Sequence, residues 1–512
     1  MPAKLEGKAV TAPPRPTHTD PVALSTLADA AGARLIATTD GTVVTGATLR
    51  AQHVRPGDLF AALPGARAHG ADFVADGIAA GAAAILTDEA GASRPAVRDA
   101  GLPVLVHADP RAALGSLAAT IYGEPSQRLK VLGITGTSGK TTTSYMVEAG
   151  LAAAGRTTGM IGTVETRIAG ERLASAFTTP EAPDLQALFA VMVERGVTHV
   201  PMEVSSHALA LGRVAGTSFA VGAFTNLSQD HLDFHTDLED YFAAKRLLFD
   251  GRSAREVVCV DGEWGRRLVT PKTVTVATTG EAHWTASDVR TSLSGEQTFV
   301  LHTPAGEAVP ASLPMPGSFN IANAVLAAAI LAEAGVPVET IVRGLSSVRV
   351  PGRMERVDVG QDFTAVVDYS HKPEAVALAL DAIRARADGK VIVVLGCGGD
   401  RDTAKRPLMG EAAARRSDLL VVTDDNPRSE DPAAIRAAML AGAQAVAAAE
   451  RGEVIEIGDR RQAIIAAVAR AGAGDVVVVA GKGHETGQEI AGVVHSFSDR
   501  DELAAAIRGT TS

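Results

Sequence analysis

The sequence predicts an α/β protein of three domains, and three observations carry this prediction. The chain has 512 residues, more than one hydrophobic core usually accommodates. Hydrophobic residues make up 46% of it but aromatic residues only 4%, so Ala, Val, Leu and Ile must fill the cores, as they do around buried parallel strands. Breaks that contain Pro and Gly occur at residues 122–127 (YGEPSQ) and 348–357 (VRVPGRMERV), where they fit linkers between domains.

These breaks give the expected domain bounds. Residues 1–20 are rich in Pro and Thr and predict a flexible tail. Three α/β domains are then expected over residues 21–126, 127–350 and 351–512.

Composition bounds the setting and the partners. The N-terminal stretch lacks the apolar segment of a secretion signal, and no uncharged apolar run is long enough to span a bilayer. The two cysteines, Cys259 and Cys397, give neither a disulfide framework nor a CxxC metal site. The net charge of −11 argues against nucleic acid or an anionic membrane as the main partner. We therefore expect a cytoplasmic protein that acts on small molecules.

The first domain contains a strand–helix–strand pattern. Residues 55–63 (RPGDLFAAL) and 81–89 (GAAAILTDE) have the composition of strands, and residues 69–81 (HGADFVADGIAAG) that of a helix. This order favours a small α/β domain.

The second domain opens with a strand, a glycine-rich loop and a helix. In such a loop the glycines let backbone N–H groups face a phosphate, the helix N-terminus adds positive potential, and a lysine supplies a point charge. The loop has the shorter GxxGKT form, because Ile134 stands where a full Walker A motif has its first glycine. A glycine-rich turn with a chance lysine is the alternative. The order of elements favours a site for ATP or GTP formed by Gly136, Thr137, Ser138, Gly139, Lys140, Thr141 and Thr142.

Two loops after later strands carry side chains that bind metals. Glu203 lies in PMEVSSHAL (201–209) and His231 in TNLSQDHLDFH (225–235). Taken separately, Glu203 would more often cap a helix and His231 would more often be a satisfied turn histidine. Beside a phosphate loop whose Thr141 hydroxyl can bind Mg²⁺, we expect both side chains to hold the metal.

The third domain alternates strands with Ala-rich helical stretches. Such a series predicts a parallel, Rossmann-like sheet, in which ligands bind beyond the carboxyl ends of the strands. Polar residues end each of the five expected strands, which are TAVVDYS, KVIVVLGCGG, DLLVVTDD, EVIEIGD and DVVVVAGKGHE.

Taken in order, the motifs of the chain resemble those of the Mur ligases, the amino-acid-adding enzymes of peptidoglycan synthesis. The matching stretches are GTSGKTT, EVSSHAL, FTNLSQDHLDFH, YFAAKRLLF, GSFNIAN, PGRMERV and DYSHKPEA. In the third domain GCGGDRD, DDNPR and AGKGHE are similar to the tripeptide synthetases that add meso-diaminopimelate. The resemblance implies a uridine-binding first domain, an ATPase-type second domain and an amino-acid-binding third domain.

The resemblance also implies the reaction. ATP would phosphorylate the γ-carboxylate of D-Glu in UDP-MurNAc-L-Ala-D-Glu, and the amine of meso-2,6-diaminopimelate would attack the acyl phosphate, giving an amide, ADP and phosphate. Phosphoryl transfer needs charge neutralisation and alignment more than a protein nucleophile. Mg²⁺ would be the cofactor, and the catalytic residues would be Lys140, His231 and Lys245.

For Lys245, spacing and resemblance disagree. Spacing alone predicts a surface lysine on an amphipathic helix. The resemblance implies that Lys245 carries a carbamate, an anion that can position Mg²⁺. Because only a neutral amine reacts with CO₂, we expect its surroundings to lower the pKa of this lysine.

The resemblance also implies which residues bind the nucleotide and which bind the UDP-sugar dipeptide. Nucleotide would lie between the second and third domains, so that domain closure assembles a site with Asn320, Arg353, Asp368 and His371. For Asn320, helix capping is the alternative. The UDP-sugar dipeptide would contact Leu49, Ala51, Thr178, Thr179, Ser205 and Arg213. At Ala51 the chain departs from a family pattern that has serine.

For the incoming amino acid, the resemblance points to Arg401, Asp425, Asn426, Pro427, Arg428, Gly481 and Glu485. Arg428 would pair with the distal carboxylate of diaminopimelate, which lysine lacks. Leaving its guanidinium unpaired would cost about 2–5 kcal/mol. The alternative is that Arg428 makes a surface pair with Glu430 or Asp431.

Three other functions stay open. Arg428 argues against a synthetase that adds L-lysine. The pair DDNPR and GKGHE argues against another Mur ligase or a folylpolyglutamate-type ligase. The loops of the third domain argue against a P-loop protein that hydrolyses nucleotide without ligation. We expect the chain to act as a monomer.

Overall fold

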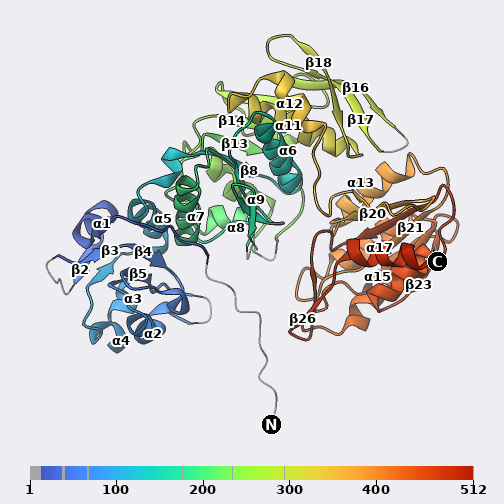
Figure 1. The fold of residues 1–512 in the computed structure, drawn as a ribbon. Helices are drawn as coiled ribbons and strands as arrows, with labels where there is room; N and C mark the ends of the chain where they lie inside the picture. Colours follow the sequence, from blue (N-terminus) through green and yellow to red (C-terminus); the bar gives the residue numbers. More distant parts are fainter. Residues whose placement is uncertain are drawn as a thin grey trace.

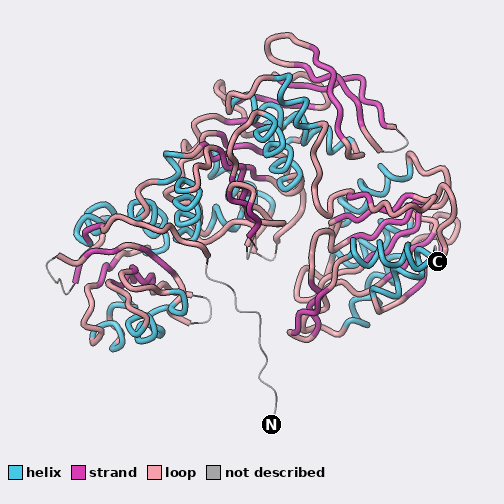
Figure 2. The backbone as a smooth tube through the Cα atoms, viewed as in Figure 1, coloured by secondary structure: helices cyan, strands magenta, loops and turns pink. Residues whose placement is uncertain are grey.

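The computed structural model describes residues 13–36, 41–65, 68–173, 177–232, 234–292 and 295–510. Figure 1 shows three bodies in chain order: a small one in blue, a larger one from teal to yellow, and a third in orange and red. Each body has its own main sheet, and helices flank the strands in all three (Figure 2). The predicted α/β fold class is confirmed.

The first sheet has the strand order β2-β7-β6-β5-β4, and only its edge strand β2 is antiparallel to its neighbour. The strands are β2 (Arg34–Ile36), β4 (Gly46–Thr48), β5 (Asp58–Ala61), β6 (Ala84–Thr87) and β7 (Val104–Val106), and β1 (Val22–Ala23) pairs with β3 (Val43–Val44). The helices are α1 (Leu24–Ala31), α2 (Val74–Ala79), α3 (Glu89–Ala92), α4 (Pro95–Arg98) and α5 (Pro110–Ile121), with short 3-10 turns at Ala51–His53 and Gly70–Phe73.

The central sheet has eleven strands within the described residues, in the order β11-β10-β9-β12-β8-β13-β14-β15-β16-β17-β18. The strands from β9 to β16 pair in parallel, and β10, β11, β17 and β18 are antiparallel extensions at the two edges. The parallel strands are β9 (Gly159–Ile161), β12 (His199–Glu203), β8 (Lys130–Thr135), β13 (Val221–Phe224), β14 (Glu256–Cys259), β15 (Thr273–Ala277) and β16 (Trp284–Thr291). The extensions are β10 (Thr166–Ile168), β11 (Glu171–Leu173), β17 (Gln297–His302) and β18 (Ala308–Leu313).

The helices of the central body pack closely on its sheet. They are α6 (Lys140–Ala153), α7 (Ala182–Glu194), α8 (Ser206–Ala210), α9 (Leu238–Arg246), α10 (Glu263–Arg266), α11 (Ser318–Glu333) and α12 (Val338–Leu345), with 3-10 turns at Pro125–Arg128 and Leu247–Phe249. A Cβ at Gly344 of α12 would lie 2.6 Å from Cα of Gly150 of α6, so glycine permits this close helix contact. The nearly all-buried α11 shares one hydrophobic core with α6 and α12.

The third sheet has the order β19-β20-β24-β21-β22-β23, and its five long strands are parallel, as predicted. The strands are β19 (Glu355–Arg356), β20 (Thr364–Asp368), β21 (Val391–Leu395), β22 (Leu419–Val422), β23 (Glu453–Glu456) and β24 (Val476–Ala480). Helices α13 (Pro373–Arg384), α14 (Lys405–Ala414) and α15 (Pro432–Ala445) share one core with the sheet, and α16 (Arg460–Val468) and α17 (Asp499–Thr510) share the other.

Some structure was not predicted from the sequence. A hairpin of β25 (Gly487–Ile490) and β26 (Val493–Ser496) follows the last parallel strand, and the antiparallel extension β16–β18 flanks the central body. No helix in the described ranges is both long and apolar enough to cross a bilayer.

Residues 13–20, which the sequence assigned to a flexible tail, lie against the body. Nη1 of Arg15 is 2.5 Å from Oδ1 of Asp58 at the start of β5, and both side chains are largely buried. The backbone N–H and the hydroxyl of Thr17 donate to Oε1 of Glu194, at 2.9 and 3.0 Å, where α7 ends. This segment therefore contacts both the first and the central body. Residues 1–12 lie outside the described residues, and for them the tail stays a prediction.

Candidate active site

The phosphate loop connects β8 to α6 where the sequence predicts it. Gly136 and Gly139 have φ angles of 144° and 88°, which side-chain-bearing residues rarely adopt. A Cβ at Gly139 would also lie 2.3 Å from Oδ1 of Asn323. The backbone N–H of Ser138 donates to Oδ1 of Asn226 at 3.0 Å. The loop is thus held open at the N-terminus of α6, where a phosphate is stabilised by the helix dipole.

Lys140 and Lys245 donate to the same carbonyl oxygen. Nζ of Lys140 lies 2.9 Å from O of Gly136, and Nζ of Lys245 lies 2.8 Å from it. Lys245 is only 1% exposed, so the surface position that spacing predicts for it is wrong. Burial lowers the pKa of Lys140 to about 8. Burial, together with the charge of Lys140, holds the pKa of Lys245 well below its usual value.

Glu203 ends β12 beside the phosphate loop and is almost fully buried. Its Oε1 accepts from Oγ1 of Thr141 at 3.0 Å and from the N–H of Thr163 at 2.8 Å, and its Oε2 accepts from Oγ1 of Thr163 at 3.0 Å. This is a set of hard oxygen donors, as Mg²⁺ requires, and Mg²⁺ usually adds phosphate and water oxygens to one or two carboxylates. The residues therefore fit the metal, although the described chain contains no cluster of three or more His, Cys, Asp or Glu side chains suited to a metal.

His231 has a strained backbone conformation, with φ of 55°, and its ring centre is 4.8 Å from that of His207, which lies on α8 four residues after Glu203. Its Nε2 is 3.1 Å from Oδ2 of Asp230, and burial lowers the pKa of His231 to about 3. A neutral imidazole is the form that binds metals. Oδ2 of Asp230 is also 2.5 Å from Nζ of Lys372, so the third body reaches the central loop.

Arg353 makes a second contact between these two bodies. Its Nη2 donates to Oγ1 of Thr141 at 3.3 Å, and its guanidinium lies over the ring of Tyr369. Asp368 is used locally, since Oδ2 accepts from the N–H of Met354 at 2.7 Å.

The other two residues expected at the nucleotide also have local partners. Nδ1 of His371 lies 2.8 Å from O of Tyr369. Nδ2 of Asn320 donates to O of Pro316 at 2.6 Å, and its Oδ1 accepts from Asn323, whose own Oδ1 lies beside the phosphate loop. Arg353 thus contacts the phosphate loop directly, whereas Asn320 is linked to the loop only through Asn323.

Four of the residues expected at the dipeptide, those of the central body, form one group beside Glu203. Oγ1 of Thr178 is 3.0 Å from Oγ1 of Thr163, and Oγ1 of Thr179 donates to O of Glu203 at 2.9 Å. The N–H of Ser205 and Nη1 of Arg213 both donate to Thr179, at 3.1 and 3.3 Å.

The first body contributes residues that follow β4. Leu49 packs against its hydrophobic core, and Ala51 is buried in the 3-10 turn. Between them, the Arg50 guanidinium lies 5.9 Å from the ring centre of Phe177, close to the threonines of the central body.

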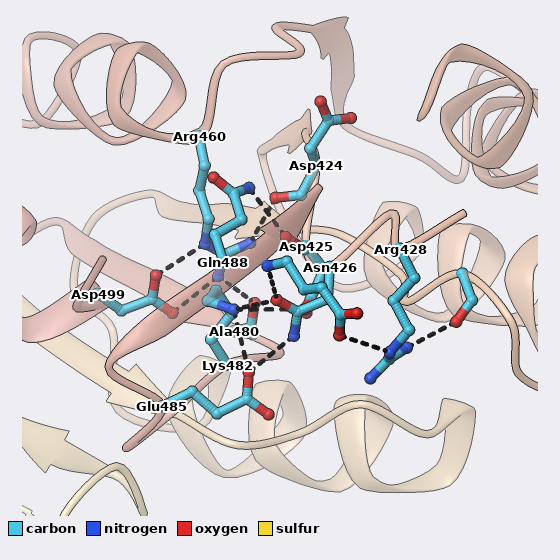
Figure 3. A network of polar contacts seen from close by, with 12 residues as sticks. Asp424, Asp425, Asn426, Arg428, Arg460, Ala480, Lys482, Glu485, Gln488 and Asp499 are labelled. Atoms are coloured by element: carbon cyan, nitrogen blue, oxygen red, sulfur yellow. Dashed lines mark hydrogen bonds and ion pairs between the residues drawn. The ribbon is translucent and has the colours of Figure 1, made fainter. Parts of the chain in front are cut away.

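The residues expected at the amino acid lie where β22 and β24 end side by side with β21, as the sheet predicts (Figure 3). Nδ2 of Asn426 donates to Oε2 of Glu485 at 2.8 Å. Arg428 donates through Nη1 to O of Gly399 at 2.6 Å, and its Nε is 3.5 Å from Oε2 of Glu489. Pro427 lies between these loop residues, and Gly481 follows β24 with φ of 111°.

The alternative partners of Arg428 are engaged elsewhere. Glu430 pairs with Arg406 at 2.8 Å, and Asp431 caps α15 by accepting from the N–H of Ala433. The surface pair that the sequence offered as an alternative is therefore not formed. Arg401 is exposed on the preceding loop, and its role stays a prediction.

Five residues of the site were missed. Lys482 is fully buried among the amino-acid-site residues, and the fully buried pair Arg460–Asp499 lies behind them (Figure 3). Lys372 and Thr163 hold the loops at the central site. Lys482 and Lys372 stand inside the motifs AGKGHE and DYSHKPEA, but only the fold reveals which distant side chain each one contacts.

Comparison with known proteins agrees with this geometry. Three family models match: the Mur ligase family catalytic domain over residues 43–122, the Mur ligase middle domain over 134–331, and the Mur ligase glutamate ligase domain over 352–483. A UDP-N-acetylmuramoyl-L-alanyl-D-glutamate--2,6-diaminopimelate ligase of Streptomyces coelicolor is 56% identical over 97% of this chain and 99% of the relative. The ligase of that name from Corynebacterium glutamicum is 56% identical over 88% of this chain and 89% of the relative. A solved structure of a ligase of this name has a TM-score of 0.65 at 30% identity, over 93% of this chain and 98% of that chain.

Proposed function

Because the chain belongs to the Mur ligase family, we infer that it is the ATP-dependent, ADP-forming ligase that joins meso-2,6-diaminopimelate to UDP-MurNAc-L-Ala-D-Glu in peptidoglycan synthesis. The observation that carries the choice of amino acid is that the cationic Arg428 and the anionic Glu485 follow β22 and β24, the two strands on either side of β21. The distal end of diaminopimelate carries a carboxylate and an ammonium, which these two charges complement. We place the reaction in the cytoplasm and propose a monomer.

In the first step, the γ-phosphoryl group of ATP passes to an oxygen of the D-Glu γ-carboxylate, giving an acyl phosphate and ADP. Lys140 and the backbone of the phosphate loop hold the phosphates, and Arg353 approaches them from the third domain. Thr141, Glu203 and His231 would hold Mg²⁺, which neutralises phosphate charge when bound. The neighbouring Thr178, Thr179, Ser205 and Arg213 would orient the dipeptide.

In the second step, the amine of diaminopimelate attacks the carbonyl carbon of the acyl phosphate. The tetrahedral intermediate loses phosphate as its C–O bond breaks, and the amine nitrogen loses a proton to give the amide. Arg428 and Glu485 bind the far end of the amino acid, so the attacking amine is directed toward the central domain.

We also propose that Lys245 reacts with CO₂ to form a carbamate. The support is its burial and its lowered pKa, which favour the neutral amine that the reaction requires. The nitrogen of the neutral amine bonds to the carbon of CO₂ and loses one proton, so a neutral group becomes an anion near the phosphate loop. Adding ¹³C-labelled bicarbonate should give a carbamate ¹³C signal that is missing in Lys245→Ala; the same spectrum in both proteins would contradict this proposal.

The test of the function measures phosphate release in the presence of ATP and UDP-MurNAc-L-Ala-D-Glu, with meso-diaminopimelate or L-lysine as the acceptor. We expect the wild type to prefer diaminopimelate, and Arg428→Ala to lose roughly 30- to several-thousand-fold of that preference, because it lacks the guanidinium. Equal use of both acceptors by the wild type would overturn the amino-acid assignment. Phosphate release without any acceptor would favour a nucleotide hydrolase.

A further inference from the structure

Lys482 places an ammonium group in the interior of the third domain. Its side chain is 0% exposed, and a buried charge is costly unless partners surround it. Nζ is 3.0 Å from Oδ1 of Asn426, 3.0 Å from Oε2 of Glu485 and 3.7 Å from Oδ1 of Asp425. All three partners belong to the group expected to bind the amino acid (Figure 3).

The first consequence concerns Asn426. Its Oδ1 accepts from Nζ of Lys482 and from the N–H of Glu489, at 3.0 and 2.9 Å. Its Nδ2 therefore faces the other way and donates to Oε2 of Glu485. An amide has one acceptor end and one donor end, so these contacts fix which end faces the carboxylate.

The second consequence concerns Glu485. Both of its contacts, with Lys482 and with Asn426, are made by Oε2. Within the described chain Oε1 accepts no hydrogen bond, and a third of the side chain is exposed. The carboxylate is thus held by one oxygen and presents the other outward.

The third consequence concerns charge. Asp425 and Glu485 are two carboxylates beside one ammonium, so the group carries one net negative charge. Arg428 lies at the other end of the same network in Figure 3. The negative Glu485, with its outward oxygen, and the positive Arg428, whose Nε is 3.5 Å from Oε2 of Glu489, would face a ligand end that carries an ammonium and a carboxylate.

We propose that Lys482 is a positioning residue that holds Glu485, directly and through Asn426, in the orientation that receives the distal ammonium of the incoming amino acid. This inference rests on the proposed function, since it takes Glu485 as a contact of diaminopimelate. Lys482 itself is too buried to touch the substrate. It acts through Oε1 of Glu485, the carboxylate oxygen that it does not contact.

The experiment compares the wild type with Lys482→Met, which keeps the length of the side chain and removes the ammonium. Rates of ADP formation are measured against meso-diaminopimelate, ATP and UDP-MurNAc-L-Ala-D-Glu in turn. We expect the KM for diaminopimelate to rise about 10- to 100-fold, because a hydrogen bond to a charged group is lost, while the other two KM values change less than about twofold. Lys390→Met, at an exposed lysine of the same domain, should leave all three unchanged.

A double-mutant cycle separates positioning from mere stabilisation of the fold. If Lys482 acts through Glu485, Lys482→Met should add little to the KM of Glu485→Gln. The double variant removes both charges of the pair, so neither charge is left without its partner. It can therefore still be compared with Glu485→Gln if Lys482→Met alone fails to fold. A double variant whose KM rises by the full product of the two single effects, or exceeds that of Glu485→Gln about tenfold, would overturn the proposal, as would an unchanged KM in a folded Lys482→Met.

The wild-type control distinguishes this proposal from the function on which it rests. Wild-type protein that uses another acceptor, or none, contradicts the ligase assignment. Wild-type protein that requires diaminopimelate, together with a folded Lys482→Met of normal KM, contradicts only the role of Lys482.

Discussion

Two ammonium groups share one carbonyl oxygen at the phosphate loop. Lys140 and Lys245 both donate to O of Gly136, and each lies where burial opposes its charge. Like charges this close disfavour each other, so the pair is most stable when one nitrogen is neutral. The pKa of Lys245 is the more strongly lowered, which leaves Lys140 as the cation that meets the phosphates.

This arrangement predicts how ATP binding depends on pH. The pKa of Lys140 is lowered to about 8, so the free protein loses this charge as the pH rises through 8, and ATP must then supply the energy to restore it. In CO₂-free buffer, the Kd for ATP should be flat below pH 8 and rise by up to about tenfold per pH unit above it. Calorimetric titration from pH 6.5 to 9.5 measures this. Lys140→Met should bind ATP weakly with no such break; a break that persists in the variant assigns the titration to another group.

Gly139 carries a second prediction at this scale. Its φ of 88° and the 2.3 Å approach of Asn323 leave no room for a side chain, so Gly139→Ala should distort the loop and weaken ATP binding at least about tenfold. Gly155, with φ of 68° and open space around it, is the matched control. Gly155→Ala should cost about 1 kcal/mol of stability and leave the Kd for ATP unchanged. Equal loss in both variants would mean that backbone strain alone matters.

At the scale of elements, two helices of the third domain are joined by two ion pairs of different burial. Arg460 of α16 and Asp499 of α17 are both 0% exposed and 2.7 Å apart, and Arg460 also donates to O of Ala480 at the end of β24. One residue further along α16, Arg461 pairs at the surface with Glu502, which is three residues further along α17, and Arg461 is 57% exposed.

This difference in burial predicts different costs. Arg460→Met leaves a buried carboxylate without a partner and should lower the free energy of unfolding of the third domain by about 3–5 kcal/mol. Arg461→Met should lower it by about 1 kcal/mol or less. Chemical denaturation followed by hydrogen exchange in residues 355–510 measures both. Similar losses in the two variants would show that packing, and not the buried charge, dominates.

The elements also show what the sequence could and could not predict. The strands of the third sheet, such as β21 and β24, are runs of five buried apolar residues between turn residues, so pattern alone located them. The hairpin β25–β26 carries the exposed Val493 and Val494 and lacks such a pattern. At the site, the phosphate loop follows from a local motif, whereas Lys482 and Lys372 have roles set by partners that are distant in sequence. A lysine is most often exposed, so sequence alone favours the surface for both.

At the scale of the whole molecule, charged and polar side chains join the third domain to the central one. Lys372 pairs with Asp230 beside His231, and Arg353 donates to Thr141. Burial alone would raise the pKa of Asp230, but Lys372 and His231 lower it overall, so the carboxylate is charged and needs its partner. These contacts hold the third domain against the phosphate loop of the central one.

Removing the Lys372 charge should therefore separate the domains. We expect Lys372→Met to increase the radius of gyration measured by X-ray scattering without nucleotide, and to lower kcat/KM for ATP by at least about tenfold, because a buried charged contact is broken. Lys390→Met removes an exposed lysine and is the control. An unchanged radius together with a lowered kcat/KM would mean that Lys372 serves the phosphates and not the domain contact.

The segment that carries Arg15 and Thr17 has a practical consequence for handling the protein. Because it connects Asp58 of the first domain to Glu194 of the central one, it works as a strap across their junction. An affinity tag that replaces residues 1–12 leaves the strap whole. A trim that extends through residue 20 removes it, and exposes a carboxylate that is otherwise 2% exposed and paired. The point at which the chain is shortened would thus decide whether the first domain keeps its alignment with the central one.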